Sequence, residues 1–201
     1  MPQWPTVPPE DRRRDRGGRG LPRPSAQQLA TAQDRPVSDL VGPALAVLLV
    51  GINPSLWSAV IDRHFGNPAN RLWPVLHLAG FTPRQLLPTD ADELLGLGIG
   101  ITNMVNRATA TAAEIRDDEL RAGVPRLLTT VETWQPEIVA FLGLHAYRVA
   151  FGRPKAAVGR QQERVADAVT WLLPNPSGLN AHYQLPDLVR LYGELHTAAC
   201  G

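Results

Sequence analysis

Asparagine, proline and serine follow apolar runs at two places in the chain. The stretch VGINPSLWSAV (50–60) places Asn53 directly after a run typical of a buried strand, and LPNPSGL (173–179) places Asn175 in the same way. A third loop with asparagines follows GIGITNMV (98–105). Amides and hydroxyls can position a water molecule and hydrogen-bond the edge of a base, but an asparagine cannot act as a strong base. Chemistry at such a site needs a leaving group that is already good.

Other catalytic patterns are missing from the sequence. It contains neither the G-x-S-x-G turn of a serine hydrolase nor the G-x-x-x-x-G-K-[ST] loop of a nucleotide-binding site. The glycines of GLGIGI (96–101) precede an apolar run rather than follow one, which favours a tight turn over a nucleotide loop. The five histidines lack metal-ligand spacing, and the single Cys200 cannot form an intramolecular disulfide or a four-cysteine zinc site. We therefore expect a cytoplasmic protein without metal or cofactor.

The composition indicates one globular domain without a strong overall charge. The chain has 201 residues and a net charge of +1, and Lys155 is its only lysine. The excess of arginine has two open explanations, codon usage in a GC-rich genome and phosphate binding. The longest apolar run, residues 44–50, is far shorter than the about 20 residues of a membrane helix, and the first residues lack the apolar core of a signal peptide. We expect no association with a membrane.

The start of the chain differs in composition from the rest. Residues 1–24 are rich in proline, arginine and glycine, with six arginines and three acidic side chains. Such a segment cannot bury enough apolar surface to offset the entropy that it would lose on ordering. We predict a disordered arm here, followed by one domain over residues 25–201. Two interpretations of the arm stay open: it scans an anionic polymer, or it is a solvated tail without a role.

Apolar runs of strand length alternate with segments of helical periodicity along the domain. Strands are expected at 44–50, 98–105, 136–143 and 168–178, and helices at 68–81, 117–134, 144–151 and 185–198. This alternation predicts an α/β fold with a parallel sheet that is covered on both faces. Ligands of such sheets bind at the carboxyl ends of the strands. The three asparagine-bearing loops are therefore expected to converge on one crevice.

Four segments together resemble a known family. GINPSLWSA, NPANRLW, GIGITNMVNRAT and LPNPSGL, in this order, are similar to segments of the mismatch-specific uracil/thymine-DNA glycosylases, which belong to the uracil-DNA glycosylase superfamily. The resemblance covers about residues 44–198. It implies a three-layer α/β/α fold with a small central, mainly parallel sheet. It also implies an enzyme without cofactor that acts as a monomer on double-stranded DNA, associated with a bacterial nucleoid.

The resemblance also implies a reaction. These enzymes turn a nucleotide out of the duplex and hydrolyse its N-glycosidic bond. The expected substrate is uracil, best in a G·U mismatch, together with other modified or mismatched pyrimidines, and the reaction initiates base excision repair. No lysine suited to Schiff-base chemistry lies in the expected crevice, so we expect a monofunctional glycosylase that leaves the strand uncut.

Five residues in or beside the matching segments receive roles around the base from this resemblance. Asn53 of GINP is expected to orient the attacking water. Phe65 is expected to stack on the flipped base, a contact worth about 1–3 kcal/mol. Ser58 corresponds to a hydroxyl near the target sugar and its phosphate, and Ile52 and Asn175 complete the base pocket.

The segment NPSGL matches the insertion loop of the family. Ser177 and Gly178 are expected to approach the DNA backbone and the partner base, with Gly178 facing an orphan guanine. Leu179 is expected to fill the space left by the flipped nucleotide, as apolar wedges do in other DNA complexes. Asn70 and Arg71 of NPANRLW are expected to fix the loop that carries the stacking aromatic side chain.

The chain departs from the pattern of the family at Asn106. Relatives commonly carry an acidic residue there, and the resemblance makes Asn106 a second catalytic residue beside Asn53. A neutral amide polarises water less well than a carboxylate, so either Asn53 suffices or the activity is reduced. A third interpretation is that Asn106 only caps the end of a strand. Trp57 replaces a small residue and is expected to narrow the pocket or to extend the DNA-binding face.

Two other classes of function stay open. The near-neutral charge and Asn106 also permit a protein that binds mismatched or abasic DNA without efficient catalysis. A hydrolase of free nucleosides is the other alternative, and it would not need PSGL as a wedge. Release of a base separates a glycosylase from the binding protein, and replacement of Leu179 by alanine separates it from the nucleoside hydrolase.

Overall fold

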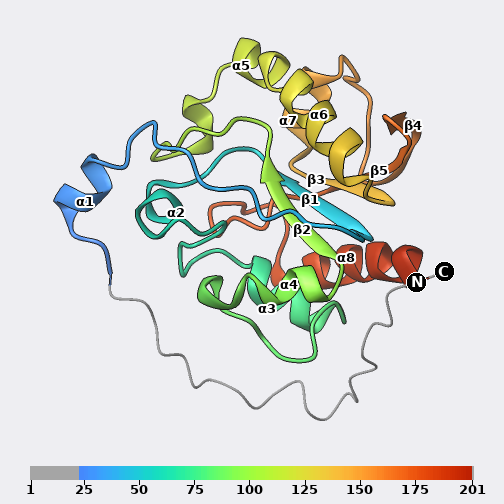
Figure 1. The fold of residues 1–201 in the computed structure, drawn as a ribbon, viewed down its shortest axis with the longest axis horizontal. Helices are drawn as coiled ribbons and strands as arrows, with labels where there is room; N and C mark the ends of the chain where they lie inside the picture. The colour runs from blue at the N-terminus through green and yellow to red at the C-terminus, as the bar shows by residue number, and fades with distance from the viewer. Residues whose placement is uncertain (1–22, 201) are drawn as a thin grey trace.

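A five-stranded sheet forms the centre of the protein (Figure 1). The computed structural model describes residues 23–200, so the arm predicted for residues 1–24 lies almost wholly outside the described residues. The strands are β1 (Val47–Gly51), β2 (Ile99–Asn103), β3 (Ile138–Leu142), β4 (Gly159–Val165) and β5 (Ala168–Leu173). Their order in the sheet is β2-β1-β3-β5-β4, and of these five strands only β4 runs antiparallel to its neighbour.

Helices cover both faces of the sheet and complete three layers. They are α1 (Ala26–Ala30), α2 (Leu56–Ile61), α3 (Leu72–Leu78), α4 (Glu93–Gly96), α5 (Asp117–Ala122), α6 (Val124–Trp134), α7 (Leu144–Ala150) and α8 (Leu185–Cys200), with 3-10 turns at Pro88–Asp90 and Ala112–Glu114. Figure 1 shows α3, α4 and α8 on one side of the sheet and α5, α6 and α7 on the other. The predicted α/β/α fold with a mainly parallel sheet is confirmed. No helix of residues 23–200 is long and apolar enough to cross a membrane.

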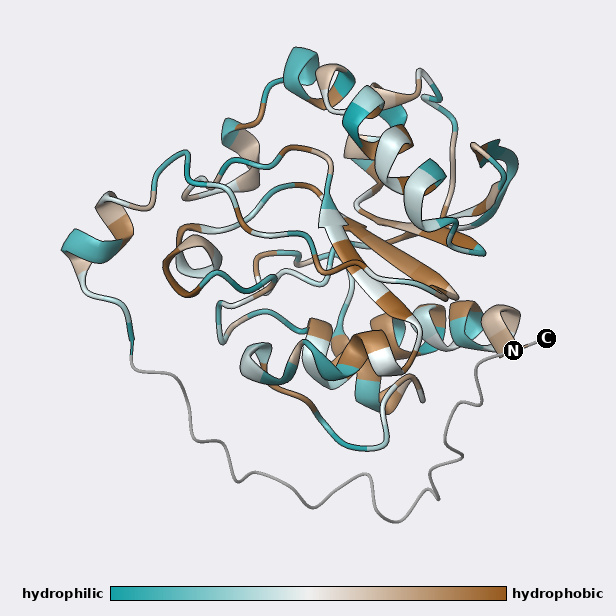
Figure 2. Ribbon diagram, viewed as in Figure 1, coloured by the Kyte–Doolittle hydropathy of each residue, from teal (hydrophilic) through white to brown (hydrophobic). Residues whose placement is uncertain are grey.

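The apolar runs of the strands supply both halves of the core. In β1, Val47 and Leu49 pack in the cluster that contains α3, α4 and α8, whereas Leu48 and Val50 pack in the cluster of α5, α6 and α7. This division follows from the alternation of side chains along a strand, which turns successive residues to opposite faces. Figure 2 shows the central strands coloured mostly as hydrophobic. Burial on both faces explains why these strands are continuous apolar runs in the sequence.

The sequence pattern does not predict β4. Its residues, GRQQERV, are mostly polar, and only Val165 among them is buried. Among the described strands, β4 pairs only with β5 and forms one edge of the sheet. An edge strand needs no continuous apolar run, and charged side chains on it discourage pairing with another chain. β4 is therefore a strand because it pairs with β5, and not because its own sequence has an apolar periodicity.

The helix predicted over 117–134 is in fact two helices, α5 and α6, which meet at Gly123. The break coincides with a close approach of two backbones, because a Cβ at Gly123 would overlap the carbonyl oxygen of Met104, just after β2. Pro125 in the first turn of α6 suits a new helix start, where its missing N–H is not needed. The other predicted strands and helices are present with different ends.

Gly123→Ala is expected to destabilise the fold, because the backbone carbonyl of Met104 cannot move aside as a flexible side chain can. We expect the free energy of unfolding to fall by about 1–3 kcal/mol, measured by urea denaturation. Gly193→Ala is the matched control, since Gly193 lies inside α8 and a Cβ there meets no atom within 4 Å. It should stabilise the protein by up to about 1 kcal/mol. The same effect at both positions would contradict the role given to the Met104 contact.

The carboxyl ends of β1, β2, β3 and β5 open on the same edge of the sheet, because these four strands are parallel. Gly51 at the end of β1 is in register with Asn103 at the end of β2. The pairing continues beyond the sheet, where the N–H of Thr109 donates to the carbonyl of Pro54 (3.2 Å). The loops after β1 and β2 therefore run side by side at this edge.

Candidate active site

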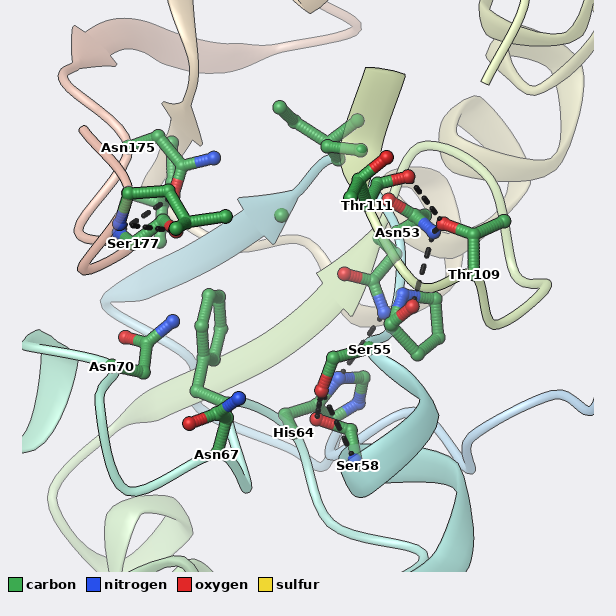
Figure 3. Close-up of a pocket in the computed structure, with 18 of the residues that line it drawn as sticks. Asn53, Ser55, Ser58, His64, Asn67, Asn70, Thr109, Thr111, Asn175 and Ser177 are labelled. Carbon is green, nitrogen blue, oxygen red and sulfur yellow. Dashed lines mark hydrogen bonds between the residues drawn. The ribbon is translucent and has the colours of Figure 1, made fainter. Parts of the chain in front are cut away.

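A cavity of about 330 Å³ lies at the carboxyl ends of the parallel strands (Figure 3). Its walls come from the loops after β1, β2 and β5, from the segment between α2 and α3, and from the end of β3. None of the described residues that line it is an aspartate, glutamate, lysine or arginine; the polar ones are asparagines, serines, threonines and His64. Such walls suit a neutral, polar, planar ligand with a few directional hydrogen bonds.

Asn53 lies on the cavity wall with its amide nitrogen held by the neighbouring loop. Nδ2 donates to the carbonyls of Pro54 (3.0 Å) and Arg107 (3.1 Å) and to Oγ1 of Thr109 (2.7 Å; Figure 3). Because two of these partners are carbonyl oxygens, the atom that meets them is the nitrogen of the amide. Oδ1 of Asn53 has no donor among the described residues. It is therefore available to accept a hydrogen bond from a water molecule or ligand in the cavity.

An ion pair fixes the loop that holds Asn53. Arg107 donates through Nε and Nη2 to the two carboxylate oxygens of Glu119 (2.6 and 3.0 Å) and through Nη1 to Asp34 (2.9 Å). This bidentate pair ties the loop after β2 to α5. The hydrogen bond from Arg107 lowers the pKa of Glu119 from 4.5 to about 2, and the same contact raises the pKa of Arg107. The carbonyl of Arg107 is thereby held where Asn53 needs an acceptor.

Glu119→Gln is expected to weaken the interaction between Arg107 and residue 119. It should also change how the free energy of unfolding depends on pH in the acidic range. Because folding lowers the pKa of Glu119 from 4.5 to about 2, its charge stabilises the fold above pH 4.5, and this contribution is lost as the pH falls towards 2. The variant should have a lower free energy of unfolding at neutral pH and a shallower decline below pH 4.5. Denaturant titrations over this range measure both effects. Glu132→Gln, at an exposed position of α6, is the control, and a similar flattening in that variant would contradict the assignment.

A second amide, that of Asn103 at the end of β2, also lines the cavity and is buried. Nδ2 of Asn103 lies 3.2 Å from Nδ1 of His64 and donates to it when the imidazole proton is on Nε2. Oδ1 of Asn103 has no donor among the described residues. A Cβ at Gly51 would overlap this oxygen, which explains in physical terms the glycine of the GINP segment.

His64 is the ionisable side chain of the cavity wall, and it is only 4% exposed. Burial lowers the pKa of His64 below its ordinary 6.5, because the charged form would lose its solvation. The imidazole is therefore neutral at neutral pH. Nε2 of His64 is buried and has no hydrogen-bond partner within the described part of the chain. His64 thus contributes a polar wall without charge.

Phe65 lines the cavity in a backbone conformation that few residues other than glycine adopt. Its φ is 50°, in the left-handed region. The indole N–H of Trp73 donates to the carbonyl of Phe65 (3.1 Å), and the N–H of Gly66 donates to Oγ of Ser58 (3.0 Å). Such a conformation costs about 1–3 kcal/mol and persists where its surroundings fix it. The buried Ser58 hydroxyl therefore supports the loop of Phe65 as well as lining the cavity.

The loop after β5 forms the other side of the cavity. Figure 3 shows Asn175 and Ser177 across the cavity from Asn53. Oδ1 of Asn175 accepts from the N–H of Ser177 (2.9 Å), and Oγ of Ser177 accepts from the N–H of Leu179 (3.3 Å). Leu179 is 84% exposed and is the only large hydrophobic side chain among the described residues that is exposed.

Two contacts attach this loop to the segment before α3. A Cβ at Gly178 would lie 2.6 Å from the carbonyl oxygen of Ala69, so the close approach requires glycine. The guanidinium of Arg71 donates to carbonyls of the same loop. Arg71 was expected to fix the loop of Phe65, but its side chain instead donates hydrogen bonds to the loop of Leu179. The sequence could not show this pairing, because the two segments are far apart along the chain.

Two residues considered in the sequence analysis lie outside this cavity. Asn106 is not among the lining residues, and its Oδ1 accepts from the N–H of Val37 (3.0 Å). That hydrogen bond joins the loop after β2 to the segment before β1. Trp57 lines a separate hollow of about 220 Å³ together with Trp73, so it does not narrow the cavity beside Asn53.

Most of the site residues expected from the sequence meet in this cavity. Those that line it are Ile52, Asn53, Ser58, Phe65, Asn175, Ser177, Gly178 and Leu179. Six polar lining residues have no role in the sequence analysis: Ser55, His64, Asn67, Asn103, Thr109 and Thr111. Asn103 could have been predicted to line the cavity, because it lies at the end of a parallel strand. The other residues could not have been predicted, because they lie on loops without a periodic pattern.

The fold is similar to that of a provisionally assigned uracil DNA glycosylase from Methanosarcina acetivorans, determined by NMR in solution. The two chains share 19% sequence identity with a TM-score of 0.53, and the match covers 79% of this chain and 98% of that chain. At this identity the likeness concerns the fold alone. Among the described residues, no group of three or more histidines, cysteines, aspartates or glutamates is placed to hold a metal ion. Fold and site define a three-layer α/β domain with a neutral, polar cavity at its strand ends.

Residues 39–195 match the model of the uracil DNA glycosylase superfamily, and this range contains every residue that lines the cavity. The chain belongs to the uracil DNA glycosylase superfamily. Members of this superfamily are DNA glycosylases, which are hydrolases. The superfamily expected from the sequence is thereby confirmed, and the mismatch-specific subfamily stays a prediction.

Proposed function

We propose that this protein is a monofunctional DNA glycosylase that hydrolyses the N-glycosidic bond of uracil, with a G·U mismatch as its best substrate. The observation that carries the proposal is the fixed amide of Asn53, whose oxygen has no donor within residues 23–200 and lies on the wall of a cavity without a charged lining residue in that range. Membership of the superfamily supports glycosylase chemistry. Neutral walls also accept other modified or mismatched pyrimidines, and removal of the base begins base excision repair.

In the proposed reaction, Oδ1 of Asn53 accepts a hydrogen bond from a water molecule and holds it beside C1′ of the target sugar. The bond between C1′ and N1 breaks, and its electron pair stays on N1, so that uracil leaves as a delocalised anion. The water oxygen bonds to C1′, and its proton passes to solvent or to the departing base. Asparagine takes no proton from the water, so the reaction depends on a good leaving group. No carboxylate lines the cavity within the described part of the chain, so these walls do not repel the departing anion.

Asn103 and Phe65 are proposed to hold the base. Oδ1 of Asn103 can accept the N3–H of uracil, while the ring of Phe65 stacks on the face of the base. The hydrogen bond from Asn103 to His64 fixes which end of the amide meets the ligand. An acceptor at this position favours uracil and thymine, which carry N3–H, over cytosine, whose N3 is itself an acceptor. The residues proposed to complete the pocket are Ile52, Ser58 and Asn175.

Leu179 is proposed to fill the gap that the flipped nucleotide leaves in the duplex. Its side chain is 84% exposed on a loop that lines the cavity. Apolar wedges of this kind compensate for unstacking in other DNA complexes. Ser177 and Gly178, next to it in the loop, are proposed to contact the DNA backbone and the orphan guanine. A hydrolase of free nucleosides would have no use for this exposed leucine, so the loop supports double-stranded DNA as the substrate.

The proposal assigns the positioning of water to Asn53. Asn106 was expected to be a second catalytic residue, but its Oδ1 is occupied by the N–H of Val37, and we propose that it supports the loop after β2. Lys155, the only lysine of the chain, does not line the cavity, which supports base removal without strand cleavage. One chain carries the water-positioning amide, the base pocket and the wedge, so we propose that a monomer is active.

Asn53→Ala is expected to lower the rate of uracil release from a U·G duplex by about 100-fold or more, because the attacking water loses the acceptor that orients it. A single-turnover assay with excess protein measures this rate, with U·A, T·G and single-stranded uracil as further substrates. Asn106→Asp is compared in the same assay and should keep a rate close to that of the unmodified protein, because residue 106 faces Val37.

Two results would change this assignment. No release of base from any substrate by the unmodified protein, together with retained binding of abasic DNA, would leave the damage-binding alternative. A large gain in rate for Asn106→Asp would show that residue 106 reaches the reaction centre and that a carboxylate is needed there.

Asn103→Ala is expected to reduce the release of uracil about 5- to 150-fold, which corresponds to about 1–3 kcal/mol for a lost hydrogen bond at a buried site. A 3,N4-ethenocytosine has no N–H at the ring position that Asn103 would meet, and its release should fall less. Both lesions are measured opposite guanine under single-turnover conditions. Asn67→Ala, at an exposed asparagine of the cavity rim, is the control. An equal loss for the two lesions would contradict the role proposed for Asn103.

A further inference from the structure

The loop that carries Leu179 has few attachments to the rest of the protein. Within residues 175–183, the hydrogen bonds are short-range turns between residues that are close along the chain. Among the described residues, every hydrogen bond that joins this loop to a segment distant in sequence comes from Arg71. Short-range turns set the shape of a loop, but they do not set its position relative to the cavity. That position depends on Arg71 and on the close packing of Gly178.

Arg71 reaches both ends of the loop with one side chain. Nε donates to the carbonyl of Pro176 (3.3 Å), and Nη1 donates to that of Tyr183 (2.7 Å). Nη2 donates to the carbonyls of Ser177 (2.5 Å) and Asn180 (3.0 Å). The backbone N–H of Arg71 also donates to Pro176 (3.0 Å). Four carbonyls therefore converge on one planar cation, an arrangement that suits the fixed fork of a guanidinium.

The charge of Arg71 is balanced by these carbonyls rather than by an acid. Arg71 is half-buried, and the hydrogen-bond partners of its guanidinium among the described residues are all carbonyl oxygens. Arg107, in contrast, is paired with Glu119 and Asp34. A cation removed from water is costly unless hydrogen bonds satisfy it. The loop thus solvates Arg71 while Arg71 holds the loop, so a change in either one disturbs both.

We propose that Arg71 is the positioning residue of the Leu179 wedge and holds the loop in its projecting conformation before DNA binds. This inference rests on the proposed glycosylase function. A leucine on an untethered loop would have to be ordered during insertion, and ordering the backbone costs conformational entropy. A loop that is ordered in advance avoids that cost in the step that opens the duplex. Arg71 therefore acts on base flipping and not on hydrolysis of a base that already lies outside the stack.

Two substrates separate flipping from hydrolysis. One is a U·G duplex, and the other carries the same uracil inside a small unpaired bubble, where pairing and stacking are already lost. Single-turnover rates of uracil release are measured for the unmodified protein, Arg71→Lys and Arg71→Gln. Lysine keeps the charge but cannot span four carbonyls. Both variants should lower the duplex rate about tenfold or more and leave the bubble rate nearly unchanged.

Two further variants show whether the effect belongs to the wedge. Arg148→Lys is the matched control, because the Arg148 guanidinium also donates to a loop carbonyl, that of Ala156, which does not line the cavity. Its ratio of duplex rate to bubble rate should equal that of the unmodified protein. In a Leu179→Ala background, Arg71→Lys should have no further effect on the duplex rate, because no wedge is left to position.

Gly178→Ala provides an independent test in the case in which neither Arg71 variant folds. Gly178→Ala moves the same loop at its other contact, the carbonyl of Ala69, and should lower the same rate ratio. An unchanged ratio in a folded Gly178→Ala protein would then overturn the inference.

Several results would overturn the inference while the glycosylase function stands. One is an equal loss of rate on both substrates. Another is a duplex rate for Arg71→Lys equal to that of the unmodified protein. A third is additive effects of Arg71→Lys and Leu179→Ala on the duplex rate. Release of uracil from the duplex but not from the bubble by the unmodified protein would also overturn it, because opening would then not be what the loop supplies. No release from either substrate by the unmodified protein would instead refute the proposed function itself.

Discussion

The hydrogen bonds that hold the amide of Asn53 are the constraint on which the site depends. Nδ2 of Asn53 can reach the carbonyl of Arg107 and the hydroxyl of Thr109 only because β1 and β2 are adjacent and parallel. Their register pairs Gly51 with Asn103, so both strands end at the same level. The apolar run of β1 therefore does more than fill the hydrophobic core. It also fixes the spacing of two polar loops without placing a charged group at the site.

Among the described residues no charged side chain lines the cavity, which suits the depth at which the ends of these strands lie. Asn103 and His64 are 2% and 4% exposed, and burial lowers the pKa of His64. A carboxylate at this depth would need a partner to offset its lost solvation, and it would also repel the anionic leaving group of the proposed reaction. The ion pair of Arg107 with Glu119 contributes rigidity instead, since neither residue lines the cavity.

The periodic parts of the fold, and the residues that end each strand, could be predicted from the sequence. Run 44–50 is continuous because both faces of the sheet are buried, and the asparagines after such runs meet because parallel strands end at one edge. The edge strand β4 could not be predicted, because it has little apolar surface to bury. The role of His64 depends on a turn with a left-handed Phe65, which has no periodic signal. Arg71 binds carbonyls 105 to 112 residues away, a pairing that only the folded chain reveals.

On each side of the cavity, one close contact is possible only because a glycine has no Cβ. At Gly51 the missing Cβ leaves room for the Oδ1 of Asn103, and at Gly178 it lets the loop of Leu179 lie against the carbonyl of Ala69. Neither glycine has a positive φ, so both positions require space rather than backbone freedom. In the proposed reaction, Asn103 meets the base and Leu179 opens the duplex. The two glycines therefore constrain different steps, recognition at residue 51 and opening at residue 178, although neither needs to touch the reacting atoms.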